Sequence, residues 1–247
     1  RGLGDVYKRQ DLRKHLGPEI SVEPPDAFAA ALDSLEGPVR VDRASAPKAV
    51  SDRLAAAGVE IVWAPDPCIL PKARKNPAEI AGTAEAHLRD GAAMCAFLAW
   101  LDAEAPKGTL TEIAVVSALE GFRRATNALR DISFDTICGA GPNGAIVHYR
   151  VTEGTDRPVK TGELLLVDSG GQYVDGTTDI TRTVAVGQVG EPEKLAFTRV
   201  LQGMVAISRA RWPRGLAGRD LDTLARMPLW LAGQDYDHGT GLSLIHI

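Results

Sequence analysis

The chain has 247 residues, of which 45% are hydrophobic and 24% charged, and its formal net charge at pH 7 is −4. This composition excludes wholesale disorder, collagen and coiled coil, and the length fits one large domain or one domain with part of another. The acidic balance argues against nucleic acid as the main partner. The longest apolar run, Ala92 to Leu101, is far shorter than the roughly 20 residues that span a bilayer, so we expect a soluble protein.

The three cysteines are Cys68, Cys95 and Cys138, which lie far apart and include no CxxC pair. An odd number of isolated cysteines predicts buried, unreactive thiols rather than a disulfide framework or a zinc-thiolate site. Free thiols are typical of a reducing compartment, so we expect the protein to be cytoplasmic.

Residues 1–10 and residues 242–247 both read as non-native sequence, and neither segment is used to predict the fold. Between them, residues 11–72 are expected to form the C-terminal part of one domain and residues 73–241 a second domain. In the first of these, a strand over 39–42, a helix over 47–57 and a strand over 59–64 predict a βαβ unit. The proline-rich segment that follows, up to Lys72, is expected to be a rigid non-helical connector at the domain boundary.

A long helix is predicted to begin at the N-cap Asn76, with Pro77 at its first position and Glu79 completing a capping box, and to end near Pro106. Its expected core face is Ile80, Ala84, Leu88, Cys95 and Leu98. A second capping box, Thr109-x-x-Glu112, predicts a helix that runs to about Leu129.

Residues 132–186 are rich in β-forming residues, and two more helices are expected over about 193–211 and 220–231. The inward face of the first of these is predicted to be Phe197, Leu201, Met204 and Ile207. Residues 139–144 match G-x-G-x-x-G, but the strand-like residues 145–149 follow instead of a helix, which argues against dinucleotide binding. We expect a tight loop there that leads into a strand.

Two aspartates mark the strongest chemical signal. Strands over 164–168 and 177–184 flank a glycine-containing loop and predict a hairpin, in which Asp168 and Asp179 can share one face. Two such charges about 4 Å apart repel by roughly 4 kcal/mol at an effective dielectric of about 20. Arg182 is expected on the other face, so a hard divalent cation is the better counter-charge. The alternative is a turn-forming Asp168 and a solvated Asp179, and Gly170-Gly171 leaves room for a bulge that would change the register.

Two histidines have settings of interest. His148 lies within an apolar strand, where it is either a satisfied core residue or a functional one, and His238 precedes the flexible Gly-Thr-Gly turn. A neutral imidazole can bind metal or hydrogen-bond a reacting group. The remaining histidines, His15, His87 and His246, are interpreted as structural or incidental.

The segments GPNGAIVHYR, LLLVDSGGQYVDGTTDITRT and DYDHGTG resemble the Xaa-Pro aminopeptidases of the pita-bread metallopeptidase family, M24. The resemblance covers residues 73–241, and residues 11–72 resemble the end of the creatinase-like α/β domain that precedes the catalytic domain in this family. It implies an α+β pita-bread fold. The implied function is metal-dependent removal of the N-terminal residue from peptides with proline in second position.

The resemblance also implies two divalent ions, manganese first with cobalt or zinc as alternatives, held by two Asp, one His and two Glu. Asp168 and Asp179 match the aspartates, while His148 and His238 match histidines that line the substrate site. The family's HGTGH motif places its metal-binding histidine at position 242, where this chain has Leu242, and its glutamates lie further downstream. We therefore expect the intact gene product to be a hydrolase and these 247 residues alone to be inactive.

Two other interpretations of the function stay open. One is a prolidase or another aminopeptidase of the same fold, and the other is a non-catalytic pita-bread module that binds without metal.

The expected partners are peptides with a penultimate proline, with no nucleic acid and no membrane. A homodimer is also possible in this family, and the sequence leaves the oligomeric state open.

Overall fold

The computed structural model describes residues 14–241, and the chain divides into two units, Arg1–Lys75 and Asn76–Ile247. The division falls three residues beyond the boundary expected at residue 72. No helix among the described residues is both long enough and apolar enough to cross a membrane.

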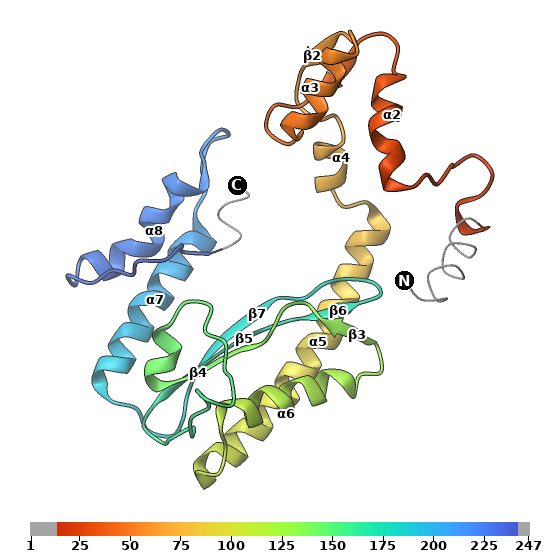
Figure 1. Cartoon of the computed structure of the whole chain (residues 1–247). Helices are drawn as coiled ribbons and strands as arrows, with labels where there is room; N and C mark the ends of the chain where they lie inside the picture. Colours follow the sequence, from red (N-terminus) through yellow and green to blue (C-terminus); the bar gives the residue numbers. More distant parts are fainter. Residues whose placement is uncertain (1–13, 242–247) are drawn as a thin grey trace. The chain divides into compact units, whose positions relative to one another are not determined.

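The first unit contains the expected βαβ arrangement (Figure 1). Its elements are η1 (Pro25–Ala27), α2 (Phe28–Asp33), β1 (Val39–Val41), α3 (Lys48–Ala56), β2 (Ile61–Trp63) and α4 (Ile69–Ala73). Strands β1 and β2 pair in parallel, and α3 connects them with Leu54 fully buried. The parallel strand–helix–strand prediction is therefore confirmed.

The connector after β2 is helical in part, so the prediction of a non-helical segment is wrong. Helix α4 includes Pro71 at its third position. The first turn of a helix has no internal acceptor for its N–H groups, so a proline there removes no hydrogen bond.

The second unit packs two helices against one face of an antiparallel sheet (Figure 1). Its helices are α5 (Pro77–Glu104), η2 (Ala105–Lys107), α6 (Glu112–Arg124), η3 (Gly141–Ala145), α7 (Glu191–Arg209) and α8 (Gly218–Trp230). Its strands are β3 (Leu129–Ile132), β4 (Ile137–Ala140), β5 (Leu164–Ser169), β6 (Gly171–Tyr173) and β7 (Ile180–Ala185). Strands β4, β5 and β7 form one sheet in that order, and β3 pairs with β6 in a second.

The core lies between α5, α6 and the sheet. Along β5, Leu165 and Val167 point inward and are fully buried against Phe97 and Leu101 of α5 and Val115 of α6. Side chains alternate along a strand, so the same pattern turns Asp168 to the opposite face. The apolar face of β5 thus packs into the core, and the opposite face carries Asp168.

Helix α5 begins as predicted, with both hydrogen bonds of the Asn76–Glu79 capping box present. The predicted core face is wrong for four of its five residues, and only Leu98 packs against the core. Ile80 and Leu88 are 57% and 72% exposed, and Ala84 and Cys95 are exposed as well. The buried side chains are Ala86, Asp90, Ala93, Met94, Phe97 and Leu101. These residues also recur at helical spacing, but they include the charged Asp90. The hydrophobic pattern of the sequence therefore did not identify them as the buried face.

The N-cap of α6 also differs from the prediction. The cap is Thr111, whose hydroxyl accepts from the Ala114 N–H, and the carboxylate of Glu112 is used elsewhere. The helix ends at Arg124 rather than near Leu129, because Asn127 adopts a left-handed conformation and turns the chain into β3.

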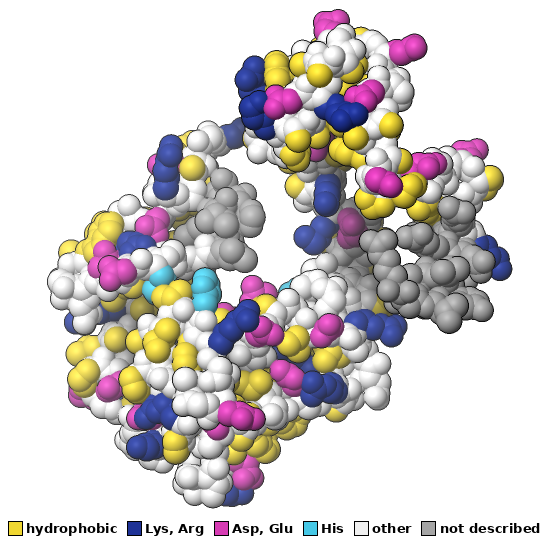
Figure 2. Space-filling model, viewed as in Figure 1, with side chains coloured by type: hydrophobic (Ala, Val, Ile, Leu, Met, Phe, Trp, Pro, Cys, Tyr) yellow, Lys and Arg dark blue, Asp and Glu magenta, His cyan; other side chains and the backbone are white. Residues whose placement is uncertain are grey.

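The predicted inward face of α7 is wrong for three of its four residues. Phe197, Leu201 and Met204 are exposed among the described residues, and hydrophobic side chains are visible on the surface of this part of the molecule (Figure 2). Helix α7 contacts α8 at Gly203, where an added Cβ would lie 2.1 Å from the carbonyl oxygen of Ala225. A glycine is required where the two backbones approach this closely.

The expectation of buried thiols holds only for Cys138, which lies inside the core, where burial raises the pKa of its thiol. Cys68 and Cys95 are exposed. A thiol is small and weakly polar, so its hydropathy does not determine its burial.

Substitution of Gly170 tests the packing of the hairpin that carries the aspartates. An added Cβ at Gly170 would lie 2.0 Å from the carbonyl oxygen of Thr178 and 2.2 Å from the Ser133 hydroxyl, so we expect Gly170→Ala to lower the free energy of unfolding by about 1–3 kcal/mol. The matched control is Gly121→Ala in α6, where the space is open and we expect a gain of up to about 1 kcal/mol. Denaturant unfolding measures both, and equal effects would contradict the packing argument.

Candidate metal and substrate site

The hairpin of β5 and β7 places both aspartates on one face. Asp168 lies opposite Thr181, and Asp179 lies two residues before Thr181 on the same side of the pleat. Arg182 lies opposite Val167, so it points to the other face, as predicted. The two carboxylates are therefore diagonal neighbours across adjacent strands.

The register of this hairpin is continuous to its tip. Beyond Ser169, the N–H of Thr178 donates to Gly171, and the N–H of Tyr173 donates to Gly176, both in the same register as the β5–β7 pairs. The bulge considered at Gly170-Gly171 is absent from this pairing. An uninterrupted ladder fixes which face each aspartate occupies.

The two carboxylates carry no counter-charge of their own. Within residues 14–241 neither Asp168 nor Asp179 forms an ion pair, and the one side-chain hydrogen bond to Asp168 comes from the Thr181 hydroxyl at 2.7 Å. Burial, followed by the nearby negative charge of Asp168, raises the pKa of Asp179. The arrangement is a negative site that a cation would stabilise.

Both aspartates line a cavity of about 830 Å³ together with the two predicted histidines. Its lining is Phe134, Asp135, Ile137, Val147, His148, Arg150, Asp168, Asp179, Thr181 and residues 238–241. Asp168 lies in β5, Asp179 directly precedes β7, and the two histidines come from separate loops. The tertiary structure thus brings together every site residue that the sequence indicated.

His148 does not lie in a strand, so that prediction is wrong. Helix η3 follows β4 directly, and His148 sits in a turn with φ of 54°, in the left-handed region. Ile146 and Val147 are each 54% exposed, so their β-branched side chains do not pack as they would in a strand of the sheet. The G-x-G-x-x-G segment forms a tight loop, and no α-helix follows it to hold a dinucleotide.

Glu112 of α6 holds this loop, and the sequence analysis missed it. Its carboxylate is fully buried and accepts from the Ala140 N–H at 2.7 Å, the Asn143 amide at 3.0 Å and the Tyr149 hydroxyl at 3.0 Å. In the sequence, Thr109-x-x-Glu112 resembled a capping box and concealed this role. The available signal was the helical spacing of Glu112 with Val115 and Leu119, which places a carboxylate on the buried face of the helix.

His238 is held by a second charged residue, Arg226 of α8. The guanidinium donates to the carbonyl oxygen of Tyr236 at 2.6 Å and to that of His238 at 2.8 Å. It also pairs with Asp222 and Asp235, each at 2.8 Å. The imidazole of His238 stacks on the Tyr236 ring, with centroids 4.6 Å apart. Its Nδ1 lies 2.8 Å from the carbonyl oxygen of Gly239. These contacts leave the exposed imidazole at the edge of the cavity.

The tip of the hairpin is anchored on α5. Arg89 makes two hydrogen bonds to Asp175, at 3.0 and 3.1 Å, and Tyr173 donates to buried Asp90 at 2.7 Å. Asp90 also pairs with Arg123, which is fully buried. Hydrogen bonds from Arg123 and Tyr173 lower the pKa of Asp90 against the opposing effect of burial. This network holds the tip of the hairpin that carries the aspartate pair.

The aspartate pair fits part of a divalent-cation site. Carboxylate oxygens are the ligands that hard cations prefer, and the mutual repulsion of the pair is relieved by a positive charge. Among residues 14–241, however, no group of three or more His, Cys, Asp and Glu side chains is placed to hold a metal ion. Position 242, where the family motif expects a metal-binding histidine, lies outside the described residues. Within the described part of the chain, the aspartate pair is therefore a negatively charged site with two carboxylates and no third side chain of these types beside them.

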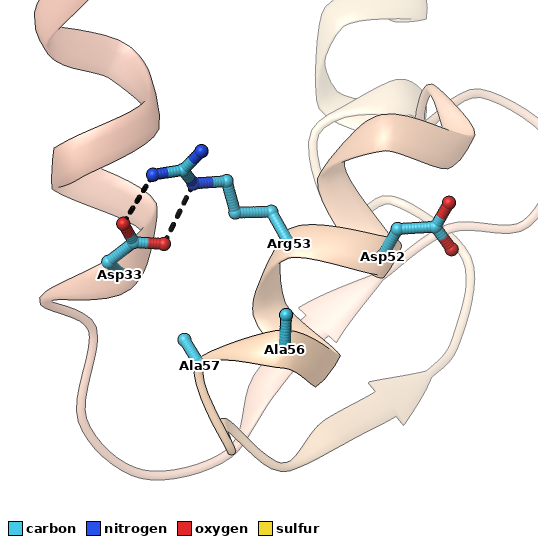
Figure 3. A pocket seen from close by; sticks show the side chains of 5 residues that line it. All are labelled: Asp33, Asp52, Arg53, Ala56 and Ala57. Atoms are coloured by element: carbon cyan, nitrogen blue, oxygen red, sulfur yellow. Dashed lines mark hydrogen bonds and ion pairs between the residues drawn. The ribbon is translucent and has the colours of Figure 1, made fainter.

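A hollow in the first unit has no comparable chemistry. The Arg53 guanidinium on its wall is neutralised by two hydrogen bonds to Asp33, at 2.5 and 2.8 Å (Figure 3). Asp52, which points away from this pair in Figure 3, is bound by Lys48. The remaining lining residues are Ala56 and Ala57, so no unpaired polar group faces a ligand there.

Comparison with known proteins decides the class of the second unit. A family model, metallopeptidase family M24, matches residues 81–245. The chain belongs to metallopeptidase family M24. Its fold is the α+β pita-bread fold of that family, as predicted.

Among similar M24 proteins, the Xaa-Pro aminopeptidase ApepP of Drosophila melanogaster is 44% identical over 174 residues, which cover 70% of this chain and 28% of the fly protein. A crystal structure of X-prolyl aminopeptidase from Caenorhabditis elegans, described as a cytosolic enzyme with a di-nuclear active site, superposes with a TM-score of 0.79 and 32% identity. It covers 89% of this chain and 37% of the worm protein.

The Xaa-Pro dipeptidase of Bacillus anthracis gives a TM-score of 0.62 and 26% identity over 78% of this chain and 52% of the bacterial one. The chain spans between 37% and 41% of the length of the first curated relatives it matches. The family assignment therefore concerns a part of the length of these relatives.

Asp179→Asn tests the electrostatic strain in this M24 site. In chelator at about pH 7 we expect the free energy of unfolding to rise by a few tenths of a kcal/mol, because repulsion between neighbouring strands is worth roughly 0.2–1 kcal/mol and exposure to solvent weakens it. The pKa of Asp179 is raised in the folded chain, so the penalty is present above that raised pKa and is lost as the pH falls toward the ordinary value of 3.8.

Denaturant unfolding at about pH 7 and about pH 3.5 measures this difference. A gain that is equal at both pH values would show that the substitution acts through packing rather than charge.

Proposed function

We propose that this chain is part of a metal-dependent Xaa-Pro aminopeptidase, which removes the N-terminal residue from peptides with proline in second position. The observation that carries the proposal is the cavity that joins Asp168 and Asp179 with His148 and His238. Similar proteins from the fly and the worm, which match this part of the chain, are named Xaa-Pro and X-prolyl aminopeptidase, and this supports the same reaction here.

Asp168 and Asp179 would hold two divalent ions, manganese first and cobalt or zinc as alternatives. When bound, such a pair of ions polarises the scissile carbonyl and supplies an activated water for hydrolysis. The role of the two aspartates is to hold negative charge on one face of a rigid hairpin, so that the cations bind without any rearrangement of the strands. The remaining ligands would come from residues beyond position 241.

His148 and His238 would act on the substrate. Both imidazoles are exposed at the cavity that contains the aspartates, where they can donate hydrogen bonds to the oxygen on which charge develops. The rim also carries an Arg150–Asp135 ion pair at 2.8 Å, so the guanidinium there is already neutralised.

A prolidase is the second candidate within the family, and the structural likeness to the Bacillus anthracis dipeptidase favours keeping it. A non-catalytic module is less well supported, because the aspartate pair is present and unneutralised. We propose a cytoplasmic location, in line with the worm relative, which is described as cytosolic. Peptides are the proposed partners, and a homodimer is an open part of the proposal.

The full gene product tests the function directly. With Mn²⁺ we expect it to release the first residue of a tripeptide with proline in second position, and to act far more slowly on the same tripeptide with alanine there. Asp179→Asn should lose both manganese and turnover, whereas Asp102→Asn, an exposed carboxylate on α5, should keep both. Activity on dipeptides alone would favour the prolidase.

These 247 residues by themselves should show no turnover, because on this proposal residues 14–241 would supply only Asp168 and Asp179 as metal ligands, and no third such side chain lies beside them. Turnover by this chain with Mn²⁺ would contradict the proposed division of the ligand set. An inactive full product that binds no manganese would instead favour the non-catalytic module.

His148→Ala tests the substrate-side role of this residue. In the full product we expect turnover to fall by about 10²-fold, because one preorganised hydrogen-bond donor contributes about that much, with the manganese content unchanged. His87→Ala, an exposed histidine on α5, is the matched control. Loss of metal in His148→Ala, measured by elemental analysis, would reassign His148 as a ligand.

A further inference from the structure

One buried carboxylate binds both ends of the loop that carries His148. The loop leaves β4 at Ala140 and returns to the core at Tyr149, and both residues donate to Glu112, at 2.7 and 3.0 Å. Asn143, in the middle of the loop, donates to both carboxylate oxygens of Glu112, at 3.0 and 3.1 Å. Glu112 has no exposed surface, and the reaction described above makes no use of it.

The conformation of His148 needs such an anchor. Its φ of 54° lies in the left-handed region, which is unfavourable for a residue with a Cβ. The turn is closed by a hydrogen bond from the Tyr149 N–H to the Ile146 carbonyl at 3.2 Å. Ile146 and Val147 are exposed and contribute no core packing, whereas Tyr149 is buried. The buried Tyr149 side chain is therefore what fixes the turn next to His148.

We propose that Glu112 is a positioning residue for His148. Through the Tyr149 hydroxyl and the Asn143 amide, its carboxylate holds the loop so that the His148 imidazole is presented to the cavity of the aspartate pair. The proposal deepens the proposed function and rests on it in one respect, namely that His148 acts on substrate.

The chemistry of the contacts requires a carboxylate at this position. Ala140, Asn143 and Arg157 present N–H donors to Glu112, the last at 3.4 Å, and the Tyr149 hydroxyl is a further donor. A carboxylate is an acceptor at both oxygens, so it satisfies donors on both sides. Glutamine has the same shape, but its NH₂ group would face a donor in either orientation.

The decisive variants are Glu112→Gln and Tyr149→Phe, the second of which keeps the buried ring and removes the hydroxyl that contacts Glu112, the Asn143 amide and the Thr155 carbonyl. The matched control is Glu120→Gln, a carboxylate on the same helix that pairs with exposed Arg124 and contacts no loop residue. In the metal-free 247-residue chain, NMR follows amide hydrogen exchange of residues 146–150 and the Cα shift of His148, which reports its left-handed conformation.

We expect both variants to accelerate exchange in this turn by about tenfold or more, and to move the His148 Cα shift, because each loses a hydrogen bond to a charged group. The thermal midpoint of Tyr149→Phe should stay close to that of the control. If Glu112→Gln does not fold, Tyr149→Phe still decides the outcome. A His148 shift and exchange rates equal to those of the control in Tyr149→Phe would overturn the proposal.

The full gene product supplies a second readout. There Tyr149→Phe should lower kcat with unchanged KM and manganese content, and adding His148→Ala to it should lower kcat no further than His148→Ala alone. Additive losses would overturn the proposal. If the full product has no Xaa-Pro activity in any form, the proposed function fails, while the NMR measurements still decide the role of Glu112.

Discussion

Repulsion between Asp168 and Asp179 is the constraint on which the rest of the site depends. A hairpin relaxes such a repulsion by slipping its register or twisting apart, and several features prevent both. The close approach at Gly170 leaves no room for a shifted strand, and the ion pair of Asp175 with Arg89 ties the hairpin tip to α5. The fold thus holds two negative charges on one face of the hairpin, an arrangement suited to binding divalent cations.

Each histidine of the cavity is held by one charged residue behind it. Glu112 fixes the loop of His148, and Arg226 fixes the loop of His238 through backbone carbonyls and carboxylates. Apart from the buried ring of Tyr149, these loops contribute little apolar packing, so polar contacts hold them in place. Hydrogen bonds are directional, which suits segments whose function depends on the placement of a single side chain.

Membership of family M24 rests on the second unit, and the cavity belongs to that unit as well. Different segments of the chain supply the different groups of the cavity. The hairpin carries the two negative charges, and the two loops carry His148 and His238. Within residues 14–241 the aspartate pair is joined by no third His, Cys, Asp or Glu side chain placed to hold a metal ion. The described residues do form the rigid support of the aspartate pair. This support consists of the ion pair between α5 and the hairpin tip and of the paired strands β5 and β7.

The sequence by itself determined the local features: the Asn76 capping box, the parallel βαβ unit and the face shared by Asp168 and Asp179, because each depends on spacing along a few residues. Only the tertiary structure decided which stripe of α5 is buried, since that stripe includes charged Asp90 and its partner Arg123 lies far along the chain. It also decided the turn at His148, where a bond from Tyr149 to distant Glu112 outweighs the local preference for a strand. Contacts between segments far apart in sequence carry no periodic signal, and this is why they appear only in the folded chain.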